Sequence, residues 1–400
     1  MNIFKKIYCR TYQFILKIAI PFLPYHEPKL LDDYEALSQT LKQNDIKRIL
    51  VVADKTLISL GLLDNLKNTL ESGGFDIYIY DKTVANPTTD NVEEGVVFYN
   101  ENHCQAIIAF GGGSIMDCAK AIGARIARPK KSLNQMQGIL KVRKKIPLLT
   151  CIPTTAGTGS ETTIASVITD SKTRHKYAIN DFPLIPSFAI LDAKLTVGLP
   201  PHITATTGMD ALTHAIEAYI GNSLTKSTKK YALEAISLVF DNLFKVYENG
   251  RDLTARQKML KASYLAGLAF TKSYVGYVHA IAHSLGGKYN VAHGEANAIL
   301  LPFVLKKYGK KIHKKLKQIC VYLGLCAPDT PKEEASEIFI RHIEKLNDLM
   351  SIPKYIEKLK KEDIEELAKT AEKEANPLYP VPVLYTAKDL QTIYLQVCKD

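Results

Sequence analysis

Ala106-Ile-Ile-Ala-Phe-Gly-Gly-Gly-Ser-Ile-Met-Asp-Cys-Ala-Lys120 is the stretch of sequence that decides the fold. Its apolar start indicates a buried strand, the glycines at 111–113 indicate a turn, and residues 114–127 are typical of a helix. Backbone N–H groups at such a helix N-terminus bind a pyrophosphate well. The spacing is not G-x-G-x-x-G, so a plain strand-to-helix turn stays equally open on this motif alone.

The same alternation continues on both sides of this stretch. We expect further strands over 48–53, 75–80, 148–152 and 188–191, and helices over 60–70 and 91–102. Strands alternating with helices of this length predict an α/β domain whose parallel sheet is covered on both faces. After Pro200-Pro201 strand-like runs almost disappear and amphipathic helical patterns dominate. We therefore predict an N-terminal extension over 1–34, an α/β domain over 35–199 and a helical domain over 200–400.

Composition narrows the class of protein. A chain of 400 residues is long enough for two domains with separate cores. The net charge is +11, but the basic residues are spread out, and the densest run, 306–317, predicts a solvated helix face rather than a nucleic-acid site. Seven cysteines without a C-x-x-C pair argue against a disulfide framework and for a reducing compartment, so we expect a cytoplasmic protein.

Residues 1–24 predict an amphipathic helix. Its polar stripe holds Lys6, Arg10, Gln13 and Lys17, and its apolar stripe holds Ile3, Phe4, Ile7, Tyr8, Phe14, Ile15 and Ile18. Lys17 and the short apolar run argue against a transmembrane span. We favour a helix packed on the protein itself or on a second subunit; a helix on an anionic membrane or a partner is the alternative.

Four side chains point to a metal. Asp210 and His214 are four residues apart in a helical pattern and face one way, and His279 and His293 lie further along the chain. One carboxylate with three imidazoles can hold Fe(II), Zn(II), Mn(II) or Co(II) and leave a position open for substrate. His283, four residues after His279, makes one histidine surplus, and spacing alone does not decide which one. A spare histidine beside a metal can relay protons.

Two further segments suit a nucleotide. Asp54 follows the first strand, where a carboxylate can bind an adenosine ribose and repel a 2′-phosphate, which predicts NAD over NADP. The same residue could instead cap the next helix. The stretch 153–161 follows another strand and is rich in hydroxyls and glycines, which suits cofactor contacts or an ordinary loop.

Residues 35–400 resemble the iron-containing (group III) alcohol dehydrogenase family. The resemblance lies in Gly111-Gly-Gly-Ser114-x-x-Asp117-x-Ala-Lys120, Pro153-Thr-Thr-Ala-Gly-Thr158, Gly208-x-Asp210-Ala-Leu-Thr-His214-Ala-Ile-Glu217, and His279-x-x-x-His283 through His293-Gly294. It implies a Rossmann-like NAD(P)-binding domain followed by an all-helical metal domain, the dehydroquinate synthase-like architecture. The N-terminal helix lies outside the family's common core.

The resemblance also assigns roles. It implies that Asp210, His214, His279 and His293 bind Fe(II), or alternatively Zn(II), and that His283 is the non-ligating active-site histidine. It implies NAD(H), with NADP(H) less favoured. The residues that match cofactor contacts are Asp54, Asn86, Gly112, Gly113, Ser114, Thr154, Thr155, Thr158, Lys176 and Leu191. Ala165 stands where some members have a polar contact, which puts that one hydrogen bond in doubt.

The expected function is that of a metal-dependent, NAD(H)-linked alcohol dehydrogenase or aldehyde reductase that acts on primary alcohols by direct hydride transfer. A glycerol or diol dehydrogenase of the same superfamily is one alternative. A non-catalytic scaffold subunit that acts through its N-terminal helix is another. The resemblance further implies a homodimer or larger homo-oligomer, with a small alcohol or aldehyde as substrate and no nucleic-acid partner.

Overall fold

The computed structural model describes residues 1–399, which divide into two compact units. Residues 24–198 form the α/β unit. Residues 1–23 join the chain from Leu199 onward in the helical unit. The division at 198/199 lies beside the Pro200-Pro201 step in the sequence pattern, whereas the N-terminal extension belongs to the helical unit rather than standing apart.

The α/β unit is built on a six-stranded sheet in the order β1-β9-β6-β4-β2-β3, with every pair parallel. The bounds are β1 Lys29–Leu30, β2 Arg48–Val52, β3 Asp76–Tyr80, β4 Ala106–Gly111, β6 Leu148–Pro153 and β9 Phe188–Ala189. Every residue of β4 is buried, which explains its continuous apolar run.

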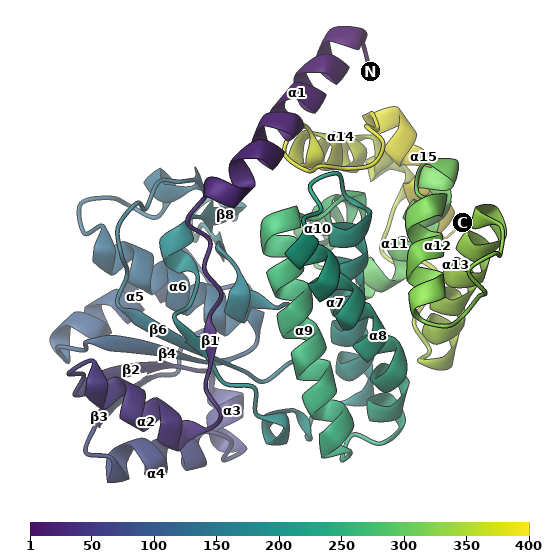
Figure 1. Ribbon diagram of the computed structural model, residues 1–400. Helices are drawn as coiled ribbons and strands as arrows, with labels where there is room; N and C mark the ends of the chain where they lie inside the picture. Colours follow the sequence, from purple (N-terminus) through teal and green to yellow (C-terminus); the bar gives the residue numbers. More distant parts are fainter. Residues whose placement is uncertain (400) are drawn as a thin grey trace. The chain divides into compact units, whose positions relative to one another are not determined.

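Helices cover both faces of this sheet (Figure 1). The helices are α2 Tyr34–Gln43, α3 Lys55–Ser59, α4 Asp64–Ser72, α5 Thr89–Glu101 and α6 Gly113–Ala127. Side chains of α5 and α6 share one core with the sheet, and side chains of α2 and α4 share the other. The predicted Rossmann-like α/β class is confirmed. The helix expected over 60–70 begins only at Asp64, after a turn that contains Gly61 with a φ of 68°.

A second, three-stranded sheet was not predicted. It contains β5 Gly138–Ile139, β7 Ala165–Thr169 and β8 Lys176–Asn180 in the order β5-β8-β7. The buried side chain of Lys120 on α6 holds the segment that leads into β7. Its Nζ donates to the carbonyls of Ser160 at 2.6 Å, Thr163 at 3.0 Å and Ala165 at 3.0 Å. The strands were missed because they are short and only half buried.

The helical unit packs around α7. Its longer helices are α7 Pro201–Ile220, α8 Lys226–Glu248, α9 Leu253–Ser273, α10 Tyr277–Tyr289, α11 His293–Tyr308, α12 His313–Tyr322, α13 Lys332–Leu349, α14 Ile364–Ala375 and α15 Ala387–Val397. α7 is buried along most of its length and packs against α8, α9 and α11. A Cβ at Gly208 would lie 2.2 Å from Leu243 Cδ1, so this glycine permits the close approach of α8. Within residues 1–399, no helix is long and apolar enough to cross a bilayer.

The N-terminal helix α1, Ile3–Ala19, packs on the helical unit beside α14 (Figure 1). The buried side chains of α1 are Cys9 and Gln13, whereas its apolar stripe faces outward. Packing on the protein's own body was the favoured expectation, but Arg10 and Gln13 of the polar stripe make the contact, not the apolar stripe.

Candidate metal centre and nucleotide site

α7 supplies one face of the candidate metal centre. Asp210, His214 and Glu217 follow one another at helical spacing, and all three are buried. Buried charges are costly unless they are paired, so three such groups on one face predict partners on the neighbouring helices.

Glu217 connects α7 to the start of α10. Its carboxylate accepts hydrogen bonds from Gly276 N at 2.7 Å and Val278 N at 2.8 Å, the first free N–H groups of α10. It also lies 2.7 Å from His279 Nδ1. A Cβ on Gly276 would lie 2.6 Å from Glu217 Oε1, so only glycine allows this approach. One carboxylate thus starts the helix and orients the imidazole, whose Nε2 turns toward Asp210.

α11 brings the remaining histidine. His293 is the first residue of this helix, and the next residue, Gly294, packs so closely that a Cβ would lie 2.3 Å from Thr206 O on α7. One turn later, Asn297 Nδ2 donates to Asp210 Oδ1 at 2.7 Å and lies 3.1 Å from His293 Nε2. Asn297 therefore holds the two groups side by side.

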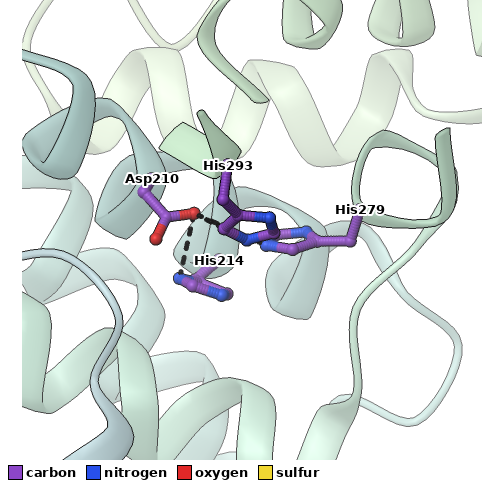
Figure 2. A group of neighbouring side chains, drawn as sticks. All are labelled: Asp210, His214, His279 and His293. Carbon is purple, nitrogen blue, oxygen red and sulfur yellow. Dashed lines mark ion pairs between the residues drawn. The ribbon is translucent and has the colours of Figure 1, made fainter. Parts of the chain in front are cut away.

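Figure 2 shows Asp210, His214, His279 and His293 converging. One potential ligand atom from each lies within 4.8 Å of all the others. Asp210 Oδ1 is 3.4 Å from His293 Nε2, 3.7 Å from His279 Nε2 and 3.8 Å from His214 Nδ1. Among the described residues, the buried His279 Nε2 has no hydrogen-bond partner. This nitrogen- and oxygen-rich set with a buried, unused imidazole nitrogen fits a divalent transition metal.

The electrostatics of Asp210 and His293 suit metal binding. Burial alone would raise the pKa of Asp210, but the imidazoles of His214, His293 and His279 outweigh it and lower that pKa. Burial is also the main reason that the pKa of His293 falls well below its usual value. Asp210 is therefore ionised and His293 neutral near pH 7, the forms in which both side chains bind metals. His279 differs, because the effect of burial is outweighed by Asp210 and Glu217, which raise its pKa to about 9, so a metal would have to displace its proton.

His283 lies beside this cluster but is not part of it. It follows His279 by one turn on α10, and its ring stacks on that of His293 with centroids 5.1 Å apart. Its Nδ1 lies 2.6 Å from Glu374 Oε1, which also accepts a hydrogen bond from the Tyr379 hydroxyl at 2.7 Å. Burial alone would raise the pKa of Glu374, but His283 and Tyr379 outweigh it and lower that pKa. An ionised Glu374 can hold His283 in one orientation.

In the α/β unit, the candidate cofactor residues follow neighbouring strands. Asp54 follows β2, Gly112 follows β4, Thr154 follows β6 and Leu191 comes soon after β9. Because β9, β6, β4 and β2 are adjacent and parallel, these four positions share the carboxyl edge of the sheet. Ligands of open α/β sheets bind at that edge.

Most of the other cofactor candidates meet near the start of α6. A Cβ at Gly113 would lie 2.9 Å from Thr158 Cγ2, and one at Gly112 would lie 3.3 Å from Thr155 Oγ1. On the other side of this turn, Asn86 N donates to Ser114 Oγ at 3.3 Å, and Lys176 Nζ donates to Asn86 Oδ1 at 2.7 Å.

Asp54 has the capping role that we kept open. Its Oδ1 accepts a hydrogen bond from Leu57 N at 2.9 Å and begins α3. Its role toward a ribose stays a prediction.

Sequence reasoning assigned no role to Glu217, Asn297, Glu374 or Tyr379. Glu217 and Asn297 carried a signal, because they lie at helical spacing from Asp210 and His293. Glu374 and Tyr379 lie about 90 residues from His283, and no local pattern connects them to it.

Comparisons with known proteins decide the family. The model for "Iron-containing alcohol dehydrogenase" matches residues 31–193, and that for "Fe-containing alcohol dehydrogenase family, C-terminal" matches residues 204–398. The chain belongs to the iron-containing alcohol dehydrogenase family. The alcohol dehydrogenase activity expected from the sequence is thereby confirmed. Its dependence on a metal and a nicotinamide nucleotide is supported as well, without the identity of either.

Relatives of this family member match over nearly its whole length. It is 38% identical to Alcohol dehydrogenase 4 of Saccharomyces cerevisiae (strain YJM789), covering 90% of this chain and 93% of the yeast protein. It is 39% identical to the NAD-dependent methanol dehydrogenase of Bacillus methanolicus, covering 83% and 87%. A crystal structure of 1,3-propanediol oxidoreductase superposes with a TM-score of 0.89 at 34% identity, covering 93% of this chain and 99% of that one.

Proposed function

We propose that this enzyme interconverts primary alcohols and aldehydes with NAD(H) and Fe(II), and that Asp210, His214, His279 and His293 hold the iron. The observation that carries the proposal is the convergence of one ligand atom from each within 4.8 Å. Zn(II) is the alternative metal, because the same donor set suits both ions.

The side chains would share the work as follows. A divalent metal supplies Lewis-acid chemistry toward the substrate oxygen, and a nicotinamide supplies hydride transfer. Asp210 lowers the positive charge of the site, Glu217 orients His279, and Asn297 fixes Asp210 beside His293. His283 has a free edge toward solvent, with 43% of its side chain exposed, and would carry a proton between substrate and water.

The substrate class rests on the relatives. Proteins named methanol dehydrogenase and 1,3-propanediol dehydrogenase resemble this chain about equally, at 39% and 37% identity. Both names describe primary alcohols, so we propose short primary alcohols, with terminal diols included, rather than a dedicated diol enzyme.

Metal-dependent turnover tests the proposal. The protein would be purified without oxygen, stripped of metal, reloaded separately with Fe(II) and Zn(II), and assayed by NADH oxidation with straight-chain aldehydes of increasing length. We expect turnover only after reloading, with Fe(II) the more active. A folded protein that is silent with every aldehyde and both metals would contradict the proposal.

The preference for NAD(H) has its own test in Asp54→Asn. Asparagine caps helices as well as aspartate does, so α3 should stay intact while the negative charge is lost. We expect the ratio of kcat/KM for NADH over NADPH to fall by roughly tenfold, because a 2′-phosphate is no longer repelled. Asp33→Asn, at the start of α2, is the matched control because Asp33 caps in the same way. An unchanged ratio in Asp54→Asn would remove Asp54 from nucleotide selection.

Compartment and assembly stay proposals as well. All seven cysteines are free, and six of them are buried, which supports the reducing cytoplasm. We also propose a homodimer or larger assembly, which sedimentation of the purified enzyme would measure.

A further inference from the structure

The outward face of α1 exposes large apolar side chains to solvent. It carries seven large apolar side chains, each more than half exposed, and Phe22 continues this apolar surface just beyond the helix. The set is Ile3, Phe4, Ile7, Tyr8, Phe14, Ile15, Ile18 and Phe22. Phe4 is 80% exposed and Phe22 85%. A contiguous apolar surface of this kind marks an interaction site in a folded protein.

Buried polar contacts fix this orientation of α1. Arg10 donates to Val381 O at 2.7 Å and to Pro382 O at 3.0 Å, and Gln13 Nε2 donates to Tyr379 O at 2.7 Å. At the N-terminal end, Lys5 pairs with Glu372 at 2.6 Å. Rotating the helix to bury its apolar stripe would break these bonds and leave the carbonyls of Tyr379 and Pro382 facing apolar side chains. The polar side of α1 is therefore its anchor, and the apolar side is free to bind something else.

The charges on α1 indicate what kind of surface its exposed apolar face binds. Residues 1–26 contain no aspartate or glutamate, and Lys6 and Lys17 of the polar stripe remain exposed. Lys17 also lies near Lys315, whose pKa falls to about 8 mainly through burial and further through the Lys17 charge. The helix α1 itself thus combines an apolar face with basic side chains and no acidic ones, which complements an anionic layer with an apolar interior.

We propose that α1 lies in the interface of an anionic lipid membrane, with its apolar face among the upper acyl chains and Lys6 and Lys17 at the headgroups. Its 17 residues span about 25 Å along the surface and cannot cross the bilayer. A second copy of the chain fits less well, because a two-fold interface would bring the basic side chains of both helices together.

Vesicle flotation of the full-length enzyme tests this proposal. The probes are vesicles of phosphatidylcholine alone and vesicles with about 30% phosphatidylglycerol. We expect the enzyme to float with the anionic vesicles and to remain below with the neutral ones at moderate salt. The triple variant Ile7→Ser, Phe14→Ser, Ile18→Ser should bind roughly 100-fold more weakly, from about a fivefold loss per apolar side chain. Arg10 and Gln13 are untouched, so α1 stays docked.

Two further variants sharpen the result. Leu60→Ser with Leu395→Ser removes exposed leucines elsewhere, 66% and 54% exposed, and should float like the wild type. Lys6→Gln with Lys17→Gln should weaken binding to anionic vesicles by about fivefold per lysine. All variants should keep the aldehyde reductase activity of the wild type in free solution.

Two results would overturn the proposal. One is a wild-type enzyme that fails to float with anionic vesicles. The other is a triple variant that floats normally. If the wild type fails to float and the triple variant sediments as a smaller oligomer, the face belongs to a second copy instead.

Discussion

Glu217 is not a proposed metal ligand, but the candidate metal centre depends on it because it orients the ligand His279. Its carboxylate accepts two backbone N–H bonds and holds His279 Nδ1. In Glu217→Gln, the amide can no longer accept all three hydrogen bonds, so the His279 ring should lose its fixed orientation. We expect metal affinity to fall by about 10- to 100-fold while all four ligands remain. Competition with a chelator of known affinity measures this.

The control for that experiment is Glu248→Gln, an exposed carboxylate at the end of α8. It should leave metal affinity unchanged. If Glu217→Gln also released its metal at the wild-type chelator concentration, the orienting role of Glu217 would be wrong.

Glu374 should affect turnover rather than metal binding. It contacts His283, which lies outside the ligand cluster, and Tyr379 supports it with a second hydrogen bond. We expect Glu374→Gln to lower kcat by roughly tenfold with metal content unchanged, because a misplaced His283 transfers protons less well. Tyr379→Phe should act in the same direction but more weakly. Loss of metal from Glu374→Gln would place this residue in the metal site instead.

At the scale of elements, we expect the loop after β6 to make the stability of the α/β unit depend on pH. Glu161 is buried in this loop, and its Oε1 has no hydrogen-bond partner among the described residues. Burial raises its pKa from 4.5 to about 7, although the Lys120 charge opposes the shift. The folded state therefore holds the proton more tightly than the unfolded state.

The direction in which stability changes with pH follows from the raised pKa of Glu161 in the folded state. The stability contributed by Glu161 is fully present below about pH 4.5 and is lost as the pH rises through about 7. We expect Glu161→Gln to remove this loss, worth roughly 3 kcal/mol in the free energy of unfolding between pH 5 and pH 8. Urea unfolding at both pH values measures it, with the exposed Glu101→Gln as control. Equal pH dependence in wild type and Glu161→Gln would show that Glu161 does not titrate in this range.

The elements show what a sequence can and cannot predict. The long apolar run of β4 and the glycine turn before α6 predicted the central strand and helix, because a buried parallel strand needs both faces apolar. β5, β7 and β8 were missed because they are short and only half buried, so they show no continuous apolar run. Which side of α1 packs on the protein could not be predicted either, since the carbonyls that hold Arg10 lie more than 370 residues along the chain.

At the scale of the whole molecule, the candidate site joins residues that are distant in sequence. Spacing predicted Asp210 and His214 as a pair, but it left the surplus histidine undecided between His279, His283 and the others. The resemblance to the family implies that His283 is the surplus histidine, and two contacts support this proposal: Glu217 holds His279, whose Nε2 faces Asp210, whereas Glu374 holds His283. Both carboxylates come from other helices, so no local pattern could show the difference.

The most direct test of the central claim compares His279→Ala with His283→Ala. The two positions are one turn apart on α10, and each imidazole is held by its own carboxylate. Metal content after anaerobic purification and NADH-linked aldehyde reduction would be measured for both. We predict that His279→Ala loses metal and activity together, while His283→Ala keeps its metal and loses most of its turnover. A His279→Ala enzyme that retained one metal per chain and full turnover would contradict the account.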